Sequence, residues 1–520
     1  MTDMALKSLH DPSPLLRTLF FNDRRELRTF LVSLLLYSLI LAPILMADRY
    51  YVDDWGHALL GYSQWANDGR PLTDLLMRIL GGHPPLVDFS PLPQIGAIAV
   101  LSYLSILVAR KFKLCGAVVA ALATLPLGAN PFFLENLSFK FDSLPMALSM
   151  FLVLLPILST KANNWRSWVT GTLLLAAGLC LYQPSINAFL VFLMLEFAFL
   201  QLELAPLIRL CRSFVFRVLQ LSSGLALYRT VAAMTVRGDY AVQHTATSLT
   251  NLGLLEQNLI KLWSFIVNSL WYGFRWLLIL PIVAGGIFII VIGIRYTRSN
   301  PTLNSRWLWR IASYAALPVI LLLWLNAAIA ALLVLIDSPI GSCRTMIGTG
   351  ALLTSSLVLL STFFSRLKVP YSWICVVLMI PGYTMVNLAS VYSNSLKEQK
   401  SYEANIASRL SDDIWKILDQ HPVNRITIEG NVGFSPFVLH NFGRFRVLGS
   451  LVPIDLRSDA DGGFARTVLS SYGIDIRGRP AKDERQQLLT QAIKASPMIR
   501  TRHYHLYRFD SDLVVFFSGH

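Results

Sequence analysis

Two short clusters of acidic and aromatic residues flank long apolar runs in this sequence. The first contains the adjacent carboxylates Asp53 and Asp54 between Tyr51 and Trp55. A carboxylate within hydrogen-bond reach of a hydroxyl can act as a general base. The alternative is structural, with aromatic rings at a membrane interface and Asp side chains that cap the next helix. Neighbouring helical positions point about 100° apart, so one carboxylate can act while the other orients or caps. Asp54 is favoured as the base.

The second cluster spans residues 135–143 and also mixes acids, a cation and aromatic rings at the start of an apolar run. A charge deep in hydrocarbon costs about 2.5–3.5 kcal/mol even on permissive scales. We therefore expect Glu135, Lys140 and Asp142 at the membrane edge or in a wet cavity. A structural role as helix caps, which Ser143 would share, fits Asp142 better than Glu135.

Several further residues could bind a substrate. Arg344 is the only cation in residues 337–346 and directly precedes an apolar run. Its guanidinium could hold a lipid phosphate by charge-assisted hydrogen bonds, or it could be an interfacial anchor. Arg70, His83, Gln183, Arg237 and His244 are lone polar residues in their loops, and for these a structural role is favoured. Lys140, Tyr51 and Trp55 belong to the two clusters above. The full set is Arg344, Lys140, Arg70, His83, Tyr51, Trp55, Gln183 and Arg237.

Other kinds of site are not indicated. No glycine-rich nucleotide loop stands between a strand and a helix, and residues 81–85 (Gly-Gly-His-Pro-Pro) are typical of a turn. The five cysteines lie in or beside apolar runs without CxxC spacing, so neither a zinc site nor a disulfide framework is expected. The net charge of +14 is spread between apolar runs. Because no basic stripe with interleaved aromatic residues results, no nucleic-acid partner is expected.

The composition is that of a membrane protein. Of the 520 residues 54% are hydrophobic and 15% are charged, and the mean hydropathy is +0.52. Windows of about 19 residues predict about eleven transmembrane helices, and a further apolar stretch, residues 252–276, suits an interfacial helix. The predicted spans are 29–47, 91–109, 114–128, 143–159, 168–182, 185–202, 213–234, 276–294, 311–336, 347–364 and 370–392.

The charged residues predict the orientation of these helices. Arg and Lys gather in alternate connections, which marks that side as cytoplasmic. Residues 1–28 then form an amphipathic cytoplasmic segment, without a cleavable signal, before a membrane domain at 29–394. The loops at 48–90, 130–142, 237–275 and 337–345 face the periplasm or an equivalent lumen.

After residue 394 the composition becomes that of a soluble protein, and eleven crossings place residues 395–520 outside. A small extracytoplasmic α/β domain is expected there. Its predicted order is a helix at 397–420, a strand at 425–429, a helix or turn from 435, a strand at 446–454, a helix near 485–495 and a terminal β-hairpin.

The motifs at 51–56 (Tyr-Val-Asp-Asp-Trp-Gly), 69–72 (Gly-Arg-Pro-Leu) and 135–147 (Glu-Asn-Leu-Ser-Phe-Lys-Phe-Asp-Ser-Leu-Pro-Met-Ala) resemble those of the Gtr-type (type II) O-antigen glucosyltransferases. The resemblance covers residues 29–392 and implies a GT-C-like fold in the bacterial inner membrane. It also implies inverting transfer of a hexose, usually glucose, from polyprenyl phosphate to a lipid-linked glycan. A donor synthase and a donor flippase are the implied functional partners. The implied catalytic acids are Asp53, Asp54, Glu135 and Asp142.

The residues agree with this chemistry. Transfer from a sugar phosphate needs one carboxylate to take the acceptor proton and cations to stabilise the departing phosphate. No obligatory cofactor or metal is expected, although the acids could bind a divalent cation. A lipid-linked glycan transporter or flippase would instead show broken helices with ionisable groups near the midplane. An O-antigen ligase or polymerase would carry its working residues in one large late loop.

Overall fold

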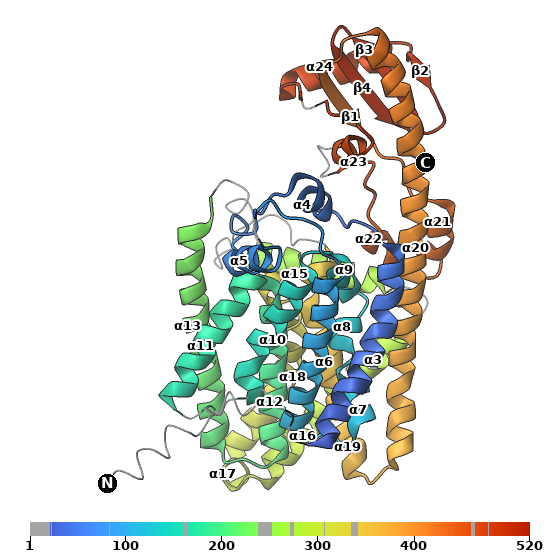
Figure 1. Cartoon of the computed structure of the whole chain (residues 1–520). Helices are drawn as coiled ribbons and strands as arrows, with labels where there is room; N and C mark the ends of the chain where they lie inside the picture. The colour runs from blue at the N-terminus through green and yellow to red at the C-terminus, as the bar shows by residue number, and fades with distance from the viewer. Residues whose placement is uncertain are drawn as a thin grey trace, which may run out of the picture.

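The structure is a computed structural model in which a helical bundle carries a small α/β domain at one end (Figure 1). It describes residues 21, 23–82, 84–159, 162, 164–237, 252–270, 275–305, 307–333, 342–458, 463–476 and 478–519. The bundle is formed by long apolar helices that run roughly side by side. The loops that carry the acidic clusters lie at the end of the bundle that faces the α/β domain (Figure 1).

Within the described residues, eight helices are long and apolar enough to cross a membrane. They lie in α3 (Arg24–Ala47), α6 (Leu92–Phe112), η1 (Gln183–Ser185) with α12 (Ile186–Leu202), α13 (Leu207–Thr235), α16 (Arg275–Ser299), α18 (Trp307–Asn326), α19 (Ile347–Arg366) and α20 (Tyr371–Gln420). The chain therefore has the helices of a polytopic membrane protein.

The other three predicted spans coincide with shorter apolar helices. These are α7 (Ala117–Thr124) followed by α8 (Pro126–Ala129), α10 (Ser143–Ser159) and α11 (Trp165–Leu181). The last two have 17 residues each, or about 25 Å at 1.5 Å per residue. That length is at the lower limit for spanning a bilayer. The total of eleven therefore stays a prediction.

Short helices fill the connections between these elements. The predicted interfacial stretch forms a helix, α15, which is not among the eight candidate spans. These short elements are α4 (Asp54–Leu60), α5 (Pro71–Leu80), α9 (Phe133–Ser138), α15 (Leu252–Ser269), α17 (Pro301–Ser305), η2 (Ala330–Leu332) and η3 (Cys343–Thr345).

Local chemistry sets the ends of α3, which leads into the first acidic cluster. The Asp23 side chain accepts a hydrogen bond from the Glu26 amide at 2.8 Å, which satisfies a free donor of the first turn. At the other end Asp48 adopts a left-handed conformation with φ of 42°. The chain therefore turns away from the helix axis at Asp48 and begins the loop that contains Asp53 and Asp54.

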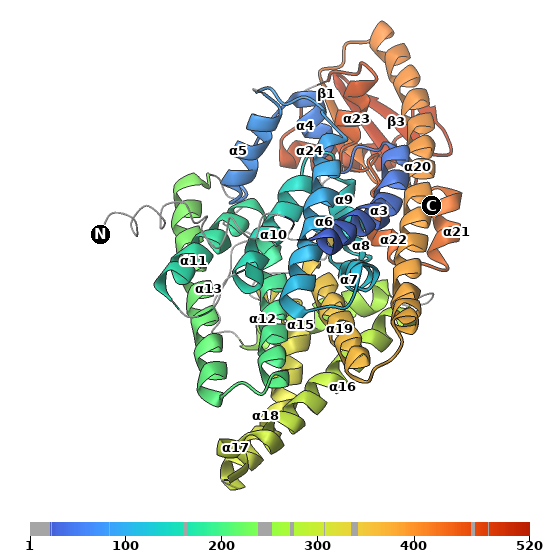
Figure 2. The same ribbon diagram turned by 60° about the horizontal axis from the view of Figure 1, so that its bottom comes forward.

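Helix α20 connects the bundle to the C-terminal domain without a break. Its 50 residues run through the predicted boundary at 394/395, because polar residues after Tyr392 alternate with buried ones at helical spacing, such as Ile406, Leu410 and Ile414. Figures 1 and 2 both show α3 and α20 side by side, and the two helices are in contact. The C-terminal domain is thus held on a continuous helix.

The C-terminal domain is a four-stranded sheet with flanking helices. The strand order is β1-β4-β3-β2, with β1 parallel to β4 and the other pairs antiparallel. Its elements are β1 (Arg425–Glu429), α21 (Pro436–Phe442), α22 (Leu448–Leu451), α23 (Ala465–Ser471), α24 (Lys482–Lys494), β2 (Ile499–Arg500), β3 (Tyr504–Phe509) and β4 (Asp512–Phe517).

The predicted first strand, the helix near 485–495 and the terminal hairpin are confirmed as β1, α24 and β3–β4. The strand predicted at 446–454 is wrong, because this segment contains the short helix α22. Its buried residues are Val447, Leu448, Leu451 and Val452. That spacing of three and four residues follows one face of a helix, whereas a strand would bury alternate residues.

Candidate functional site

Arg344 lies between two carboxylates from different loops. Its Nη1 is 3.2 Å from Oδ2 of Asp53, and its Nε is 4.0 Å from Oε1 of Glu135. The side chains of Arg344 and Asp53 are 22% and 43% exposed. Arg344 is 291 residues from Asp53 and 209 residues from Glu135 in sequence. The three side chains nevertheless form one partly open charged cluster. We call Asp53, Glu135 and Arg344 the Arg344 cluster.

Glu135 fixes the backbone that carries Arg344. Its Oε2 accepts a hydrogen bond from the Arg344 amide at 2.7 Å, and both carboxylate oxygens accept from the Ser342 hydroxyl at 2.9 and 3.1 Å. Burial raises the pKa of Glu135, although the Arg344 charge and these bonds oppose the rise. Phe139 lies 5.3 Å below the guanidinium and supports it by a cation–π contact. Glu135 is placed to position Arg344.

Asp54 lies next to Asp53 in sequence but in a different environment. It is fully buried, and it accepts three backbone N–H groups: those of Tyr51 at 3.0 Å, Lys140 at 2.9 Å and Phe141 at 3.4 Å. Burial raises its pKa well above the ordinary value, against the effect of those bonds. Asp54 therefore joins the two acidic loops through their backbones. Asp53, whose side chain is partly exposed, is thus more accessible to a substrate than Asp54, which the sequence favoured as the base.

Asp142 and Arg70 form a second ion pair beside the Arg344 cluster. Nη1 of Arg70 is 3.2 Å from Oδ1 of Asp142, and Nε1 of Trp65 donates to Oδ2 at 3.1 Å. The Arg70 guanidinium also lies 5.2 Å from the ring centre of Tyr182. The hydroxyl of Tyr182 donates to the Arg344 carbonyl at 3.0 Å. Tyr182 thus links the Arg70 guanidinium to the backbone of Arg344.

The turn that presents Arg70 needs a glycine before it. Gly69 has φ of +74°, and a Cβ there would lie 2.7 Å from the Tyr228 hydroxyl. Gln183 donates to the carbonyls of Asp68 and Gly69 at 2.9 and 3.2 Å. Gln183, predicted as a substrate-binding candidate, therefore lies against this turn and stabilises it through its backbone carbonyls.

Lys140 forms a separate cluster with acids of the first loop. Its Nζ is 2.7 Å from Asp48 and 3.2 Å from Asp88, and it lies 4.3 Å from the centre of the Tyr50 ring. Burial is the largest influence on the pKa of Asp48 and acts to raise it, but bonds from Lys140 and Lys400 outweigh burial and lower the pKa. Lys140 is paired with acids and is not part of the Arg344 cluster.

Three residues of the first loop contact the C-terminal domain. Nη2 of Arg49 is 2.9 Å from Glu403 on α20 and 2.8 Å from Asp455. The Tyr51 hydroxyl donates to the Leu451 carbonyl at 2.6 Å, and Trp55 packs against the hydrophobic core of the domain. Tyr51 and Trp55, predicted to bind substrate, thus connect the loop of Asp53 to the C-terminal domain. Arg49, Glu403 and Asp455 form what we call the Arg49 lock.

The remaining predicted residues lie elsewhere. Arg237 is exposed just beyond the end of α13. His83 and His244 fall outside the described residues. Arg49 and Asp68 were missed by the sequence reasoning, although Arg49 stands inside the first acidic cluster. Asp68 is partly buried near Arg70, and burial raises its pKa.

The acids do not converge as metal ligands. Among the residues that the structure describes, no group of three or more His, Cys, Asp or Glu side chains could hold a metal ion. The carboxylates of the Arg344 cluster face a guanidinium instead.

The family assignment rests on a sequence match that spans the Arg344 cluster and the Arg70–Asp142 ion pair. The family described as "Glucosyl transferase GtrII" matches residues 42–355. The chain belongs to this glucosyltransferase family. The match includes Asp53, Glu135 and Arg344, and it ends before α20 and the C-terminal domain. Two partners of Arg49, Glu403 and Asp455, thus lie beyond it.

A relative of the chain is known from a bacteriophage. The chain is 28% identical over 245 residues to the "Uncharacterized 55.3 kDa protein in gtrB 5'region" of Salmonella phage P22. The aligned region covers 47% of this chain and 50% of that protein. The chain thus spans about half the length of this curated relative. No solved structure matches the chain.

Proposed function

We propose that the chain is an inverting glycosyltransferase of a bacterial inner membrane. It moves a hexose, with glucose as the first candidate, from a polyprenyl phosphate to a hydroxyl of lipid-linked O-antigen or a related surface glycan. The observation that carries this proposal is the partly open Arg344 guanidinium between Asp53 and Glu135. Asp53 directly precedes α4 and Glu135 lies in α9, and both helices lie at one end of the apolar bundle (Figure 1). Membership of the GtrII family supports a glucosyl group as the cargo.

The geometry supports a single displacement. The acceptor oxygen attacks the anomeric carbon, and the bond from that carbon to the phosphate oxygen breaks with its electron pair on the phosphate. Asp53, the more exposed carboxylate of the cluster, takes the acceptor proton. Arg344 and Arg70 stabilise the negative charge of the departing phosphate. Attack opposite the leaving group inverts the anomeric configuration.

A phosphate leaves without protonation, so the second carboxylate has a different task. Glu135 accepts the Arg344 amide and holds the guanidinium beside Asp53. Asp142 does the same for Arg70 through the ion pair at 3.2 Å. Each cation thus has its own positioning acid, and Asp53 is the base in this mechanism.

The membrane placement is part of the same proposal. The site lies at the end of the bundle next to the C-terminal domain (Figure 1), which we place in the periplasm, with the N-terminus in the cytoplasm and the bundle in a GT-C-like fold. The donor must reach that face, so a donor synthase and a donor flippase are the expected functional partners. A polyprenyl chain has room along the apolar helices, several of which expose large apolar side chains.

Transfer in a reconstituted system tests this proposal. Purified protein in proteoliposomes would be given polyprenyl phosphate carrying radiolabelled glucose, together with a lipid-linked glycan acceptor. The expected result is label in the glycan, in a linkage that is inverted relative to the donor. Label that crosses the bilayer while still attached to the polyprenyl phosphate would favour a flippase and contradict the proposal.

A further inference from the structure

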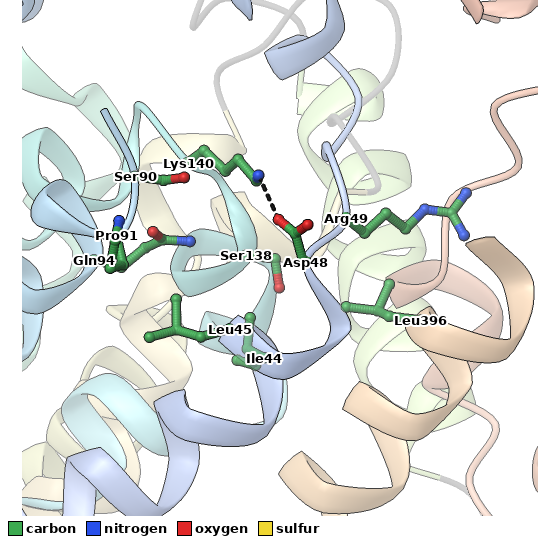
Figure 3. Close-up of a pocket in the computed structure, with 10 residues that line it drawn as sticks. All are labelled: Ile44, Leu45, Asp48, Arg49, Ser90, Pro91, Gln94, Ser138, Lys140 and Leu396. Carbon is green, nitrogen blue, oxygen red and sulfur yellow. Dashed lines mark hydrogen bonds and ion pairs between the residues drawn. The ribbon is translucent and has the colours of Figure 1, made fainter. Parts of the chain in front are cut away.

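A second polar site is formed by Asp48 of the first loop and Lys140. A pocket of about 170 Å³ opens there between the C-terminal end of α3, the N-terminal end of α6 and the middle of α20. Its apolar side is formed by Ile44, Leu45 and Leu396, and its polar side includes Asp48 and Lys140 (Figure 3). The pocket is therefore amphipathic and sits where the apolar bundle meets the polar loops.

The side-chain oxygen of Gln94 is a buried hydrogen-bond acceptor to which no described group donates. Its side chain lines the pocket on α6 and is turned toward Asp48 and Ser138 in Figure 3. The residue is only 3% exposed, and its Oε1 has no hydrogen-bond partner among the described residues. A buried amide oxygen without a partner is unfavourable unless a ligand or an ordered water donates to it. A ligand with an O–H or N–H group would satisfy this oxygen.

The charges in the pocket indicate a neutral ligand. Lys140 lies between Asp48 and Asp88 at 2.7 and 3.2 Å, and Lys400 is 3.5 Å from the second oxygen of Asp48. Arg49, the third charged residue of the lining, is paired with Glu403 and Asp455. Each charged side chain that lines the pocket thus already has a partner of opposite charge. An added anion would meet the carboxylates, and an added cation would compete with lysines already paired there. A hydroxyl group suits the site because it both donates and accepts.

We propose that this pocket is a sugar subsite, in which a neutral, hydroxyl-rich headgroup of a membrane lipid donates to Gln94 and accepts from Lys140. The apolar side of the pocket contacts the lipid end of the same molecule. The assignment rests on the proposed glycosyl transfer, since the sugar belongs either to the donor or to the lipid-linked acceptor.

Photolabelling tests the pocket without requiring transfer. The wild-type protein in nanodiscs would be labelled with an octyl glucoside that carries a diazirine, and the labelled peptides would be mapped by mass spectrometry. We expect label in residues 44–49 and 90–94, with competition by methyl glucoside and none by glycerol phosphate. Absence of label from both segments, or competition by the phosphate alone, would overturn the proposal.

Substitution of Gln94 sharpens this test. Gln94→Leu keeps the size of the side chain but removes the acceptor, so labelling of the pocket should fall about fivefold, the loss of one neutral hydrogen bond. Gln487→Leu, on the exposed face of α24, is the matched control and should leave labelling unchanged. Equal labelling of the wild type and the folded Gln94→Leu protein would overturn the proposal.

Kinetics then identify the source of the sugar. In the transfer assay, Gln94→Leu should raise KM for the acceptor if the acceptor glycan occupies the pocket, or KM for the donor if the donor sugar does. Unchanged KM values for both would contradict a substrate subsite. Absence of transfer by the wild type would contradict the proposed function alone, because the photolabelling result does not depend on turnover.

Discussion

Two clusters in this molecule have the same composition, one arginine between two carboxylates, and differ in exposure. In the Arg344 cluster the side chains of Arg344 and Asp53 are 22% and 43% exposed. In the Arg49 lock the side chains of Arg49, Glu403 and Asp455 are 2%, 6% and 7% exposed. A substrate can reach the first cluster, whereas the second is sealed between the first loop and the C-terminal domain.

The difference in exposure indicates different roles: the Arg344 cluster can take part in chemistry, and the Arg49 lock can position the loop. A partly open arginine keeps donors for a ligand phosphate, and a partly open carboxylate can accept a proton from that ligand. A sealed group of one cation and two acids does neither, but it fixes the elements that carry it. Only three residues lie between Arg49 and Asp53. The lock therefore determines where the loop of the proposed base lies, and the C-terminal domain takes part in building the site.

The largest expected effect comes from breaking the lock. Arg49→Met leaves Glu403 and Asp455 buried without their cation, and loss of one partner of a buried ion pair costs about 3–5 kcal/mol. We expect a lower melting temperature, measured by thermal unfolding in detergent, together with loss of activity. Arg237→Met, at an exposed position, is the control. A melting temperature equal to that of the wild type would show that the lock does not hold the loop.

Substitution in the Arg344 cluster should lower the rate and leave the melting temperature almost unchanged. Arg344→Met removes a cation from the proposed phosphate site, and kcat should fall about 10²–10³-fold, as for the loss of one transition-state donor. The melting temperature should change little because Arg344 is partly exposed. Initial rates with saturating donor measure the effect. A large fall in melting temperature with a normal rate for the folded fraction would place Arg344 in the scaffold.

The pH dependence of the rate distinguishes Glu135 from Asp53. The pKa of Glu135 is raised, so its ionised form is lost as pH falls through a value above the ordinary Glu range. Protonation weakens its bonds to Ser342 and Arg344, and the rate should fall in that window. Glu135→Gln removes this titration, so the acidic fall in rate should move to lower pH. An unchanged profile of kcat against pH would contradict a positioning role for Glu135.

The smallest expected effect comes from loss of the neutral hydrogen bond between Tyr182 and the Arg344 carbonyl, beside the Arg344 cluster. Tyr182→Phe removes the hydroxyl that donates to the Arg344 carbonyl at 3.0 Å. A single neutral hydrogen bond contributes about 1 kcal/mol, so the rate should fall about fivefold with Arg344 still present. A fall as large as that of Arg344→Met would mean that the tyrosine itself contacts substrate.

Much of the fold could be predicted because a long apolar run that crosses a membrane forms a helix, which satisfies its backbone hydrogen bonds internally. Each of the eleven predicted spans overlaps a helix, and eight of these helices are long and apolar enough to cross a membrane. The segment around Leu448 was misjudged because a short apolar run is compatible with both strand and helix, and only the spacing of Val447, Leu448, Leu451 and Val452 distinguishes them.

The arrangement of the candidate site could be predicted only in part. The sequence marks Asp53, Asp54 and Glu135 because they stand in clusters of acidic and aromatic residues beside apolar runs, and Arg344 because it is the only cation in residues 337–346. It does not show which residues meet, since Arg49 and Glu403 are 354 positions apart. Nor does it separate Asp53 from Asp54, which differ in exposure because only Asp54 accepts the backbone N–H groups of Lys140 and Phe141.

The two adjacent aspartates provide the most direct test of the account. Transfer of radiolabelled glucose from polyprenyl phosphate to a lipid-linked glycan would be measured in proteoliposomes with Asp53→Asn and with Asp54→Asn. We expect Asp53→Asn to lower kcat about 10²–10⁴-fold with an unchanged melting temperature. Asp54→Asn should lower the melting temperature, while its folded fraction keeps transferring. A fully active Asp53→Asn protein beside a folded, inactive Asp54→Asn protein would contradict the assignment of the base.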